Sequence, residues 1–403
     1  MPVITIFSAP YCREEEVARN LAHELRLKIL RDRQIIARAA SRYKISEDKF
    51  YRTLYGKSSV FNAFTREKER CVACYKSILA SCLLEEDLLV LGFGGFLIPK
   101  PVSHVLKVCL MADLNYRLEV AGQEHNLDRS GLEKLIAQED ASRYRWTEYV
   151  VHQGPWQSSL YDILISMEKH TIPEVSGLIR SYAKRAITLP TRESIDAGDN
   201  FALCAEIEAS LALKGWFVRT KIAGEKIEVR LDRNVLRLER LEKELAETVT
   251  GIAGDMEIEV HSGPDMFQTD VYRPFESESP ARVLLVDDEK RFARTLSERL
   301  RMREMGTAVV YNGEEALEFV DQDEPEVVIL DLKLPEIDGV QVLKHIKRSH
   351  PNVQVIILSG GGLDNDLQAC LNLGAFACLR KPVDIKELTE TIRKAHGVGF
   401  SSE

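Results

Sequence analysis

The last third of the chain alternates short apolar runs with amphipathic segments, and this alternation constrains the fold more than any other feature. Runs such as Val327–Leu330 are continuously apolar, which is typical of strands that are buried on both faces of a parallel sheet. Strands are predicted at 282–286, 307–311, 326–330, 353–358 and 376–380, and helices at 289–303, 313–321, 338–348, 363–372 and 384–396. The pattern predicts a doubly wound, five-stranded parallel sheet.

Charged and polar residues follow four of these predicted strands. Asp287 and Asp288 follow the first strand, Asp331 the third, Ser359 the fourth and Lys381 the fifth. Because parallel strands end at one edge of the sheet, these side chains are expected to converge. Three neighbouring carboxylates repel each other unless a cation lies between them, and oxygen ligands with room for water suit Mg²⁺. We therefore predict a magnesium site at this edge.

A magnesium ion that holds phosphate oxygens lets a nearby carboxylate act as a nucleophile toward a phosphoryl group. Lys381 and the Ser359 hydroxyl are then placed to bind the oxygens of the phosphorylated product. The alternative is a purely structural ion-pair network at the sheet edge. Five suitable residues at the proper strand ends favour the phosphoryl site over that alternative.

Four motifs in this region carry a family resemblance: VLLVDDE, DLKLPEIDG, ILSGGG and GAFACLRKP. Through them, residues 281–397 resemble a response-regulator receiver domain, which implies a flavodoxin-like sheet and a sensor histidine kinase or phosphotransfer protein as partner. The resemblance implies that Asp331 is the phosphoacceptor, Ser359 the switch hydroxyl and Lys381 the phosphate-binding lysine. It assigns the Mg²⁺ site to Asp287, Asp288, Asp331 and the backbone carbonyl of Lys333.

The predicted switch departs from the family pattern at one position. The family usually has an aromatic residue three positions before the lysine, and this chain has Cys378 there. Phe376 lies two residues earlier, and strand alternation predicts that it shares a face with Cys378. Phosphorylation is expected to tolerate this change, whereas Phe376 becomes the candidate for the moving group.

The amino-terminal region also reads as an α/β domain, over residues 1–182. The segments DLLVLGFGGFLIP, HVLKVCLMADLNYRLE, LIAQEDASRYRW and SSLYDILI resemble the cytidylate-kinase-like family, which implies a P-loop-kinase-like fold. The positions that match the family are Asp32-Arg33, Gly92, Arg117, Asp140, Arg143 and Tyr161-Asp162. Among them, Arg117, Asp140 and Arg143 are candidate contacts for a nucleotide or phosphate. The alternative, that the two arginines are solvated helix residues, is the commoner explanation for such side chains and is preferred.

The loop after the first predicted strand argues against kinase activity. Where the family has a loop of the type GSGGRE, this chain has the residues Tyr11 to Glu16, YCREEE, and Phe93 stands where the family has an arginine. A phosphate-binding loop needs glycines so that its N–H groups can approach the phosphates, and three successive glutamates add negative charge. We expect a pseudokinase-like output domain; the alternative is an enzyme, a receiver-regulated nucleoside monophosphate (cytidylate) kinase.

A smaller α+β module is predicted at 187–261, followed by a linker at 262–280 that is rich in Pro, Ser and acidic residues. The module weakly resembles a BON-type domain. Cys71 and Cys74 have metal or redox spacing, but no second pair completes a zinc site, so buried thiols are the preferred interpretation.

The net charge and the length of the apolar segments limit the kinds of molecule that the protein is expected to bind. A formal net charge of -9 over 403 residues disfavours wholesale binding to DNA or to an anionic membrane, and no DNA-binding motif is present. The most apolar segment, residues 88–98, is too short to cross a bilayer, and no signal peptide is visible, so a cytoplasmic location is expected. The downstream partner is expected to be a protein or a small-molecule ligand, and a homodimer is left open.

Overall fold

The computed structural model describes residues 3–85, 87–185, 189–231, 238–254, 256–262, 281–303, 305–360 and 364–399. The chain divides into two compact units, one of residues 1–57 and 68–274, the other of residues 58–67 and 275–403. The predicted linker, apart from Ser262, lies outside the described residues. Within the described ranges, no helix combines the length and apolarity needed to span a membrane.

The carboxyl-terminal unit contains a five-stranded parallel sheet in the order β10-β9-β11-β12-β13. Its strands are β9 (Arg282–Val286), β10 (Gly306–Val310), β11 (Val327–Asp331), β12 (Gln354–Ser359) and β13 (Ala377–Arg380). Its helices are α11 (Lys290–Arg301), α12 (Gly313–Gln322), α13 (Gly339–Ser349), α14 (Asp364–Asn372) and α15 (Ile385–Gly399). The predicted doubly wound parallel sheet is confirmed.

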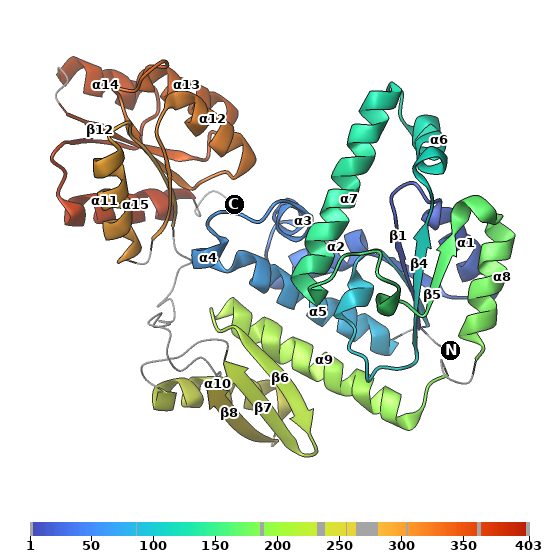
Figure 1. Ribbon diagram of the computed structural model, residues 1–403. Helices are drawn as coiled ribbons and strands as arrows, with labels where there is room; N and C mark the ends of the chain where they lie inside the picture. Colours follow the sequence, from blue (N-terminus) through green and yellow to red (C-terminus); the bar gives the residue numbers. More distant parts are fainter. Residues whose placement is uncertain are drawn as a thin grey trace. The chain divides into compact units, whose positions relative to one another are not determined.

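Helices cover both faces of this sheet, as Figure 1 shows in orange and red. Residues of α11 and α15 pack in the apolar cluster on one face, and residues of α12, α13 and α14 pack in the cluster on the other. The three central strands are buried almost throughout, which is why they read as continuous apolar runs rather than as alternating ones.

The amino-terminal sheet is also parallel and five-stranded, in the order β2-β3-β1-β4-β5. Its strands are β1 (Val3–Ser8), β2 (Lys28–Arg31), β3 (Leu88–Leu91), β4 (Val105–Met111) and β5 (Ile163–Ser166). The longer helices are α1 (Glu14–Leu25), α2 (Asp32–Tyr43), α3 (Glu47–Tyr55), α5 (Glu67–Glu85), α6 (Leu114–Glu124), α7 (Arg129–Val151) and α8 (Ile172–Ala183). The predicted α/β class is confirmed here too.

Two apolar clusters pack on the two faces of this sheet. Helices α1 and α8 contribute to one, and α2, α3, α5 and α7 to the other. The apolar run VLKVCLM within one of the family-like segments forms β4. Cys71 and Cys74 are buried in α5, and burial raises the pKa of each thiol to about 12, so both are neutral thiols in the core.

The middle region forms a three-stranded mixed sheet with two helices. Strands β6 (Val218–Ala223), β7 (Lys226–Leu231) and β8 (Glu257–Ser262) lie in that order, with β6 antiparallel and β8 parallel to β7. The helices are α9 (Arg192–Leu213) and α10 (Leu238–Ala253). The small α+β character is confirmed.

Helix α9 also belongs to the core of the amino-terminal domain. Phe201 and Ala205 lie in the same apolar cluster as Phe50, and Lys76 forms an ion pair of 2.7 Å with Glu208. Part of the predicted border between the two regions lies at residues 186–188, outside the described residues, and the domain boundaries stay predictions.

Candidate functional site

The carboxyl ends of the receiver-like strands gather the residues that the sequence pattern predicted. Asp331 is the last residue of β11, and Ser359 is the last of β12. Asp287 directly follows β9, and Lys381 directly follows β13. The neighbouring strands run in register, with Asp331 paired to Leu358, so all four positions lie at one edge of the sheet.

Three carboxylates at this edge form the site that suits a cation. One carboxylate oxygen from each of Asp287, Asp288 and Asp331 lies within 4.8 Å of the others. Asp287 and Asp331 are buried, at 0% and 6% exposure, while Asp288 is exposed. Hard oxygen ligands on two buried residues and one exposed residue match what Mg²⁺ prefers, because the ion keeps several waters or phosphate oxygens on its open side. The residues present therefore fit the ion.

Lys381 joins two of these carboxylates. Its Nζ lies 2.6 Å from Asp287 Oδ2 and 2.6 Å from Asp331 Oδ2, and its side chain is only 13% exposed. Burial alone would lower the pKa of Lys381, but hydrogen bonds to the two aspartates raise it overall. Burial raises the pKa of Asp287, although Lys381 opposes the shift. The ammonium thus compensates charge that the buried carboxylates would otherwise leave unpaired.

The backbone after β11 fixes the second oxygen of Asp331. Lys333 N donates to Asp331 Oδ1 at 3.1 Å, while Oδ2 accepts from Lys381. Gly339 lies against the carbonyl of Asp331 and against Leu332, so closely that a Cβ at this position would collide with the backbone. The Asp338-Gly339 pair of the motif is explained by this contact and by the Asp338 side chain, which caps α13 through Val340 N.

Of the predicted switch residues, Ser359 lies at this edge, whereas Phe376 stands at the other end of β13 from Lys381. Ser359 is buried, at 5% exposure, and its carbonyl accepts from Lys381 N at 2.8 Å. Phe376 precedes β13 and packs in the cluster under α11 and α15, whereas Cys378 packs in the cluster on the opposite face. The prediction that they share a face is wrong, because strand alternation applies only within the strand, which begins at Ala377.

The loop after β1 contains no glycine, although two of its residues adopt a backbone conformation that favours glycine. Tyr11 and Arg13 have φ values of 63° and 56°, in the left-handed region that costs residues other than glycine about 1 kcal/mol or more. Both stand where the resembled family has glycine. Arg13 forms a two-pronged contact with Glu16, at 2.6 and 2.7 Å, at the start of α1. The exposed guanidinium is therefore already paired.

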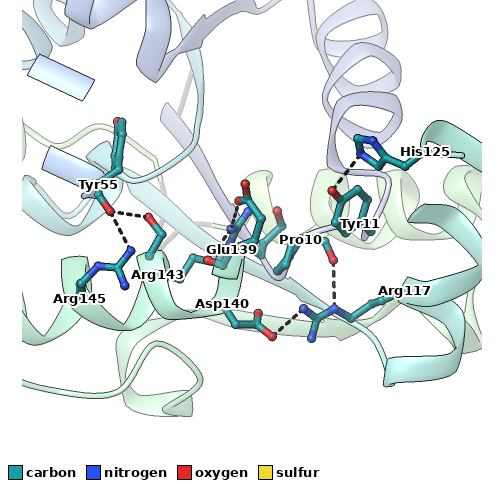
Figure 2. A network of polar contacts seen from close by, with 11 residues as sticks. Pro10, Tyr11, Tyr55, Arg117, His125, Glu139, Asp140, Arg143 and Arg145 are labelled. Atoms are coloured by element: carbon teal, nitrogen blue, oxygen red, sulfur yellow. Dashed lines mark hydrogen bonds and ion pairs between the residues drawn. The ribbon is translucent and has the colours of Figure 1, made fainter. Parts of the chain in front are cut away.

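The two candidate arginines point at this loop, as Figure 2 shows. Arg143 Nε donates to the Ser8 carbonyl at 2.7 Å, and its Nη1 lies 2.9 Å from Glu139 Oε2. Arg117 Nε donates to the Pro10 carbonyl at 3.0 Å. Each arginine is 9% exposed, so the alternative of solvated helix arginines is wrong.

Asp140, the third candidate residue, completes this network. Its Oδ2 lies 2.7 Å from Arg117 Nη2, while its Oδ1 is buried and has no hydrogen-bond partner within the described part of the chain. Tyr11 OH lies 3.1 Å from His125 Nε2, a contact that Figure 2 also shows. Sequence reasoning missed His125, which belongs to no motif, and Glu139, which lies in the segment LIAQEDASRYRW without a predicted role.

A close contact between Asp32 and Gly92 accounts for the residue type at both positions. Asp32 accepts hydrogen bonds from Tyr75 OH at 2.5 Å and from Phe93 N at 2.8 Å. Its carboxylate lies where a Cβ on Gly92 would stand, and Gly92 has a φ of 128°. Burial raises the pKa of Asp32, although these hydrogen bonds oppose the shift. Asp32 and Gly92 therefore stabilise the turn that follows strand β3.

Comparison with known proteins agrees with the geometry of the carboxyl-terminal site. Residues 283–393 match the response regulator receiver domain. Sporulation initiation phosphotransferase F of Bacillus subtilis is 34% identical over 113 residues, which are 28% of this chain and 91% of that protein. The chain belongs to the response regulator receiver family.

Other relatives match over the receiver alone. Transcriptional regulatory protein GlrR of Escherichia coli is 34% identical over 119 residues, 30% of this chain and 27% of that protein. The receiver domain of the Francisella response regulator 1452 has 28% identity, covers 29% of this chain and 98% of that chain, and gives a TM-score of 0.28.

The amino-terminal domain matches a second family. Residues 3–169 match the cytidylate kinase-like family, so this response regulator carries a cytidylate-kinase-like domain ahead of its receiver. The predicted combination of the two domains is confirmed.

Proposed function

We propose that the protein is a phosphorylation-dependent response regulator that accepts a phosphoryl group on Asp331 and regulates a non-catalytic, cytidylate-kinase-like output domain. The observation that carries the proposal is the Lys381 ammonium held 2.6 Å from both Asp287 and Asp331, with Asp288 beside them. A sensor histidine kinase or a phosphotransfer protein supplies the phosphoryl group.

The proposed reaction uses few groups. Asp287, Asp288, Asp331 and the Lys333 carbonyl would hold Mg²⁺, which neutralises charge on the phosphoryl oxygens. A carboxylate oxygen of Asp331 forms the new O–P bond while the P–N bond of the donor phosphohistidine breaks, and the imidazole leaves with the bonding electrons. Lys381 then compensates the charge of the acyl phosphate, and the Ser359 hydroxyl binds one of its oxygens. The backbone N–H of Lys333 keeps Asp331 oriented throughout.

The absence of catalysis in the output domain is supported by the loop after β1. Arg143 and Arg117 donate to loop carbonyls and contact the carboxylates of Glu139 and Asp140. Both cations are thereby partly neutralised. Tyr11 and Arg13 carry side chains where close approach of a phosphate needs glycine.

A second candidate is a receiver-regulated nucleoside monophosphate kinase. It is favoured by the left-handed φ values of Tyr11 and Arg13, which glycine adopts readily, and by the buried Asp140 Oδ1, which has no hydrogen-bond partner among the described residues. A nucleotide hydroxyl or a cation could use that oxygen. The two candidates differ in whether the protein transfers phosphate from ATP to a monophosphate.

The proposal also includes the downstream partner and the cellular location. The output is a contact with a downstream protein or a small-molecule ligand, without DNA binding, in the cytoplasm. The mixed sheet of β6, β7 and β8 serves as a BON-like binding or spacer module. A homodimer is compatible with this arrangement.

Labelling with acetyl phosphate tests phosphorylation of Asp331. The full-length protein is incubated with the donor and Mg²⁺, and the modified peptide is mapped by mass spectrometry. We expect one phosphoryl group on Asp331, lost in Asp331→Asn and after chelation of Mg²⁺. Asp321→Asn is the matched control, because Asp321 lies on α12 of the same domain with a side chain 62% exposed. Equal labelling of Asp331→Asn and the parent protein would overturn the assignment.

A further inference from the structure

Ten residues of the amino-terminal sequence belong to the carboxyl-terminal unit. The chain leaves the first unit after Lys57, beyond α3, and returns to it at Lys68, in α5. The intervening segment, Ser58–Glu67, contains the short helix α4 (Asn62–Thr65). We call it the docking segment. Its side chains pack within the carboxyl-terminal unit.

Phe61 anchors the docking segment in the receiver core. Its side chain is 0% exposed and lies in the same apolar cluster as residues of β9, β10 and β11. Its ring packs edge-on against Phe319 of α12, with centroids 5.8 Å apart and an angle of 78° between the planes. A fully buried aromatic side chain contributes more to such a contact than any surface ion pair can.

Phe64 and the edge strand complete the apolar contact. A Cβ built on Gly306, the first residue of β10, would lie 3.4 Å from Phe64 Cβ and 3.5 Å from the Phe61 ring, in ordinary van der Waals contact. The Arg301 guanidinium of α11 lies 5.5 Å from the centre of the Phe64 ring. Two aromatic residues three positions apart thus face the start of β10 together.

Polar contacts fix the register of the segment. Asp323, which caps the carboxyl end of α12, accepts from Ser59 Oγ at 3.0 Å and from Val60 N at 2.8 Å. At the other end of the segment, Glu67 Oε2 lies 3.9 Å from Arg282 Nη1, with side chains 12% and 21% exposed. The segment therefore fits a surface with matching apolar and charged parts.

This contact lies at the opposite edge of the sheet from the phosphoryl site. Gly306 and Arg282 are the first residues of β10 and β9, and Asp323 lies ahead of β11. The aspartates of the site lie beyond the last residues of the same strands. The docking segment therefore makes none of these contacts with Asp331.

We propose that Ser58–Glu67 is a cis docking element: the surface formed by α12, the start of β10 and the end of α11 binds this aromatic segment of the same chain. The segment lies between α3 and α5 in the sequence and packs within the carboxyl-terminal unit. The segment binds without phosphorylation of Asp331, because its contacts involve none of the site residues.

Covalent linkage makes such a contact effective even when its intrinsic affinity is modest, because the segment is present at a high effective concentration. The cluster that holds Phe61 also contains Val286 and Leu330, the residues just before Asp287 and Asp331. Any repacking that phosphorylation produces in this cluster is therefore applied directly to the docking segment.

Hydrogen exchange followed by mass spectrometry tests the docking in the full-length protein. We expect peptides within residues 58–67 to exchange slowly in the parent protein and more than tenfold faster in Phe61→Ala. Val60→Ala is the matched control, because Val60 is the adjacent residue and is 58% exposed, so its removal leaves the exchange unchanged.

A second variant keeps the test valid if Phe61→Ala disturbs the receiver core. Asp323→Ala removes the acceptor of two segment hydrogen bonds without opening a cavity, and we expect several-fold faster exchange in residues 58–67 with β9 and β11 still protected. Asp321→Ala serves as its control. The proposal is overturned if the parent segment exchanges as fast as an unprotected loop, or if Asp323→Ala exchanges no faster than its control.

Discussion

Both parallel sheets place charged side chains at the carboxyl ends of their strands, but they leave those charges in different states. In the receiver, Lys381 pairs with the carboxylates of Asp287 and Asp331, each of which also accepts a backbone N–H, and exposed Asp288 lies beside them. In the amino-terminal domain, Arg117 and Arg143 bind backbone carbonyls of the loop and carboxylates of α7.

The comparison indicates when a group of charged side chains can act as a binding site for a cation or a phosphate. A cation or phosphate can replace the Lys381 contacts of the receiver carboxylates, because the backbone N–H groups of Glu289 and Lys333 hold the other oxygen of each carboxylate in place. The arginines of the amino-terminal domain support the loop itself. A ligand there would have to compete with the contacts that keep the loop folded.

The largest effect is expected from removing the lysine of the receiver site. Lys381→Met leaves two buried carboxylates without their counter-charge, so we expect the receiver to lose about 3 kcal/mol of stability in the absence of metal. Hydrogen exchange of β9 and β11 in the full-length protein measures the loss. Lys290→Met, at an exposed position of the same domain, should change stability by less than about 0.5 kcal/mol. Equal effects of the two changes would contradict this picture of the site.

The arginines provide the corresponding test of the amino-terminal domain. Arg143→Ala leaves the Ser8 carbonyl unpaired in a buried setting, and we expect a loss of about 1–3 kcal/mol. Arg129→Ala on the same helix, with a side chain 71% exposed, should cost at most about 0.5 kcal/mol. Urea unfolding followed by tryptophan fluorescence reports on this domain, since Trp146 is buried in its core. If Arg143→Ala unfolds at the same urea concentration as the parent protein, Arg143 does not support the loop and is available to bind a ligand.

Magnesium should distinguish the two regions by stabilising one of them. At ten times its dissociation constant, Mg²⁺ adds about 1.4 kcal/mol to the stability of a domain that binds it only when folded. We expect this gain for β9 and β11, and no change for β1 and β4, in hydrogen exchange with and without the ion. The gain should vanish in Asp287→Asn. Stabilisation of β1 and β4 instead would place the metal in the amino-terminal loop.

The smallest effect concerns strain in the loop after β1. Arg13→Gly removes a left-handed conformation that costs roughly 1 kcal/mol and loses only an exposed ion pair, so we expect a gain of about 0.5 kcal/mol. Arg19→Gly, at an exposed position of α1, should instead cost about 1 kcal/mol. Opposite signs in thermal unfolding would confirm that Arg13 occupies a backbone conformation that favours glycine. Destabilisation by Arg13→Gly would contradict it.

Much of the receiver could be predicted because its signals are local. The apolar runs around Leu284, Ile329 and Ile356 are bounded by turn residues, so the strand limits came within a residue or two of those observed. Asp287, Asp331 and Lys381 could be placed together because parallel strands share an edge. Nothing beyond strand order was needed for that inference.

The misses have a different physical origin, since each depends on packing between distant parts of the sequence. The burial of Arg143 depends on the Ser8 carbonyl, 135 positions away in the sequence. Phe61 is buried against Phe319, and no periodicity in the segment SSVFNAFTRE predicts that contact. Strand alternation predicts the wrong face for Phe376, because this residue lies just before β13 and alternation applies only within the strand.

The central claim is that phosphate enters this protein through Asp331 and not through the loop after β1. The direct measurement follows labelled phosphate in the full-length protein with Mg²⁺, supplied either as acetyl phosphate or as the γ-phosphate of ATP together with CMP, dCMP and the other monophosphates. We predict label on Asp331 from acetyl phosphate and no transfer to any monophosphate above background, whether or not the receiver is phosphorylated. ATP-dependent phosphorylation of a monophosphate that disappears in Arg143→Ala or Asp140→Asn, in variants shown to be folded, would contradict the claim and establish the kinase instead.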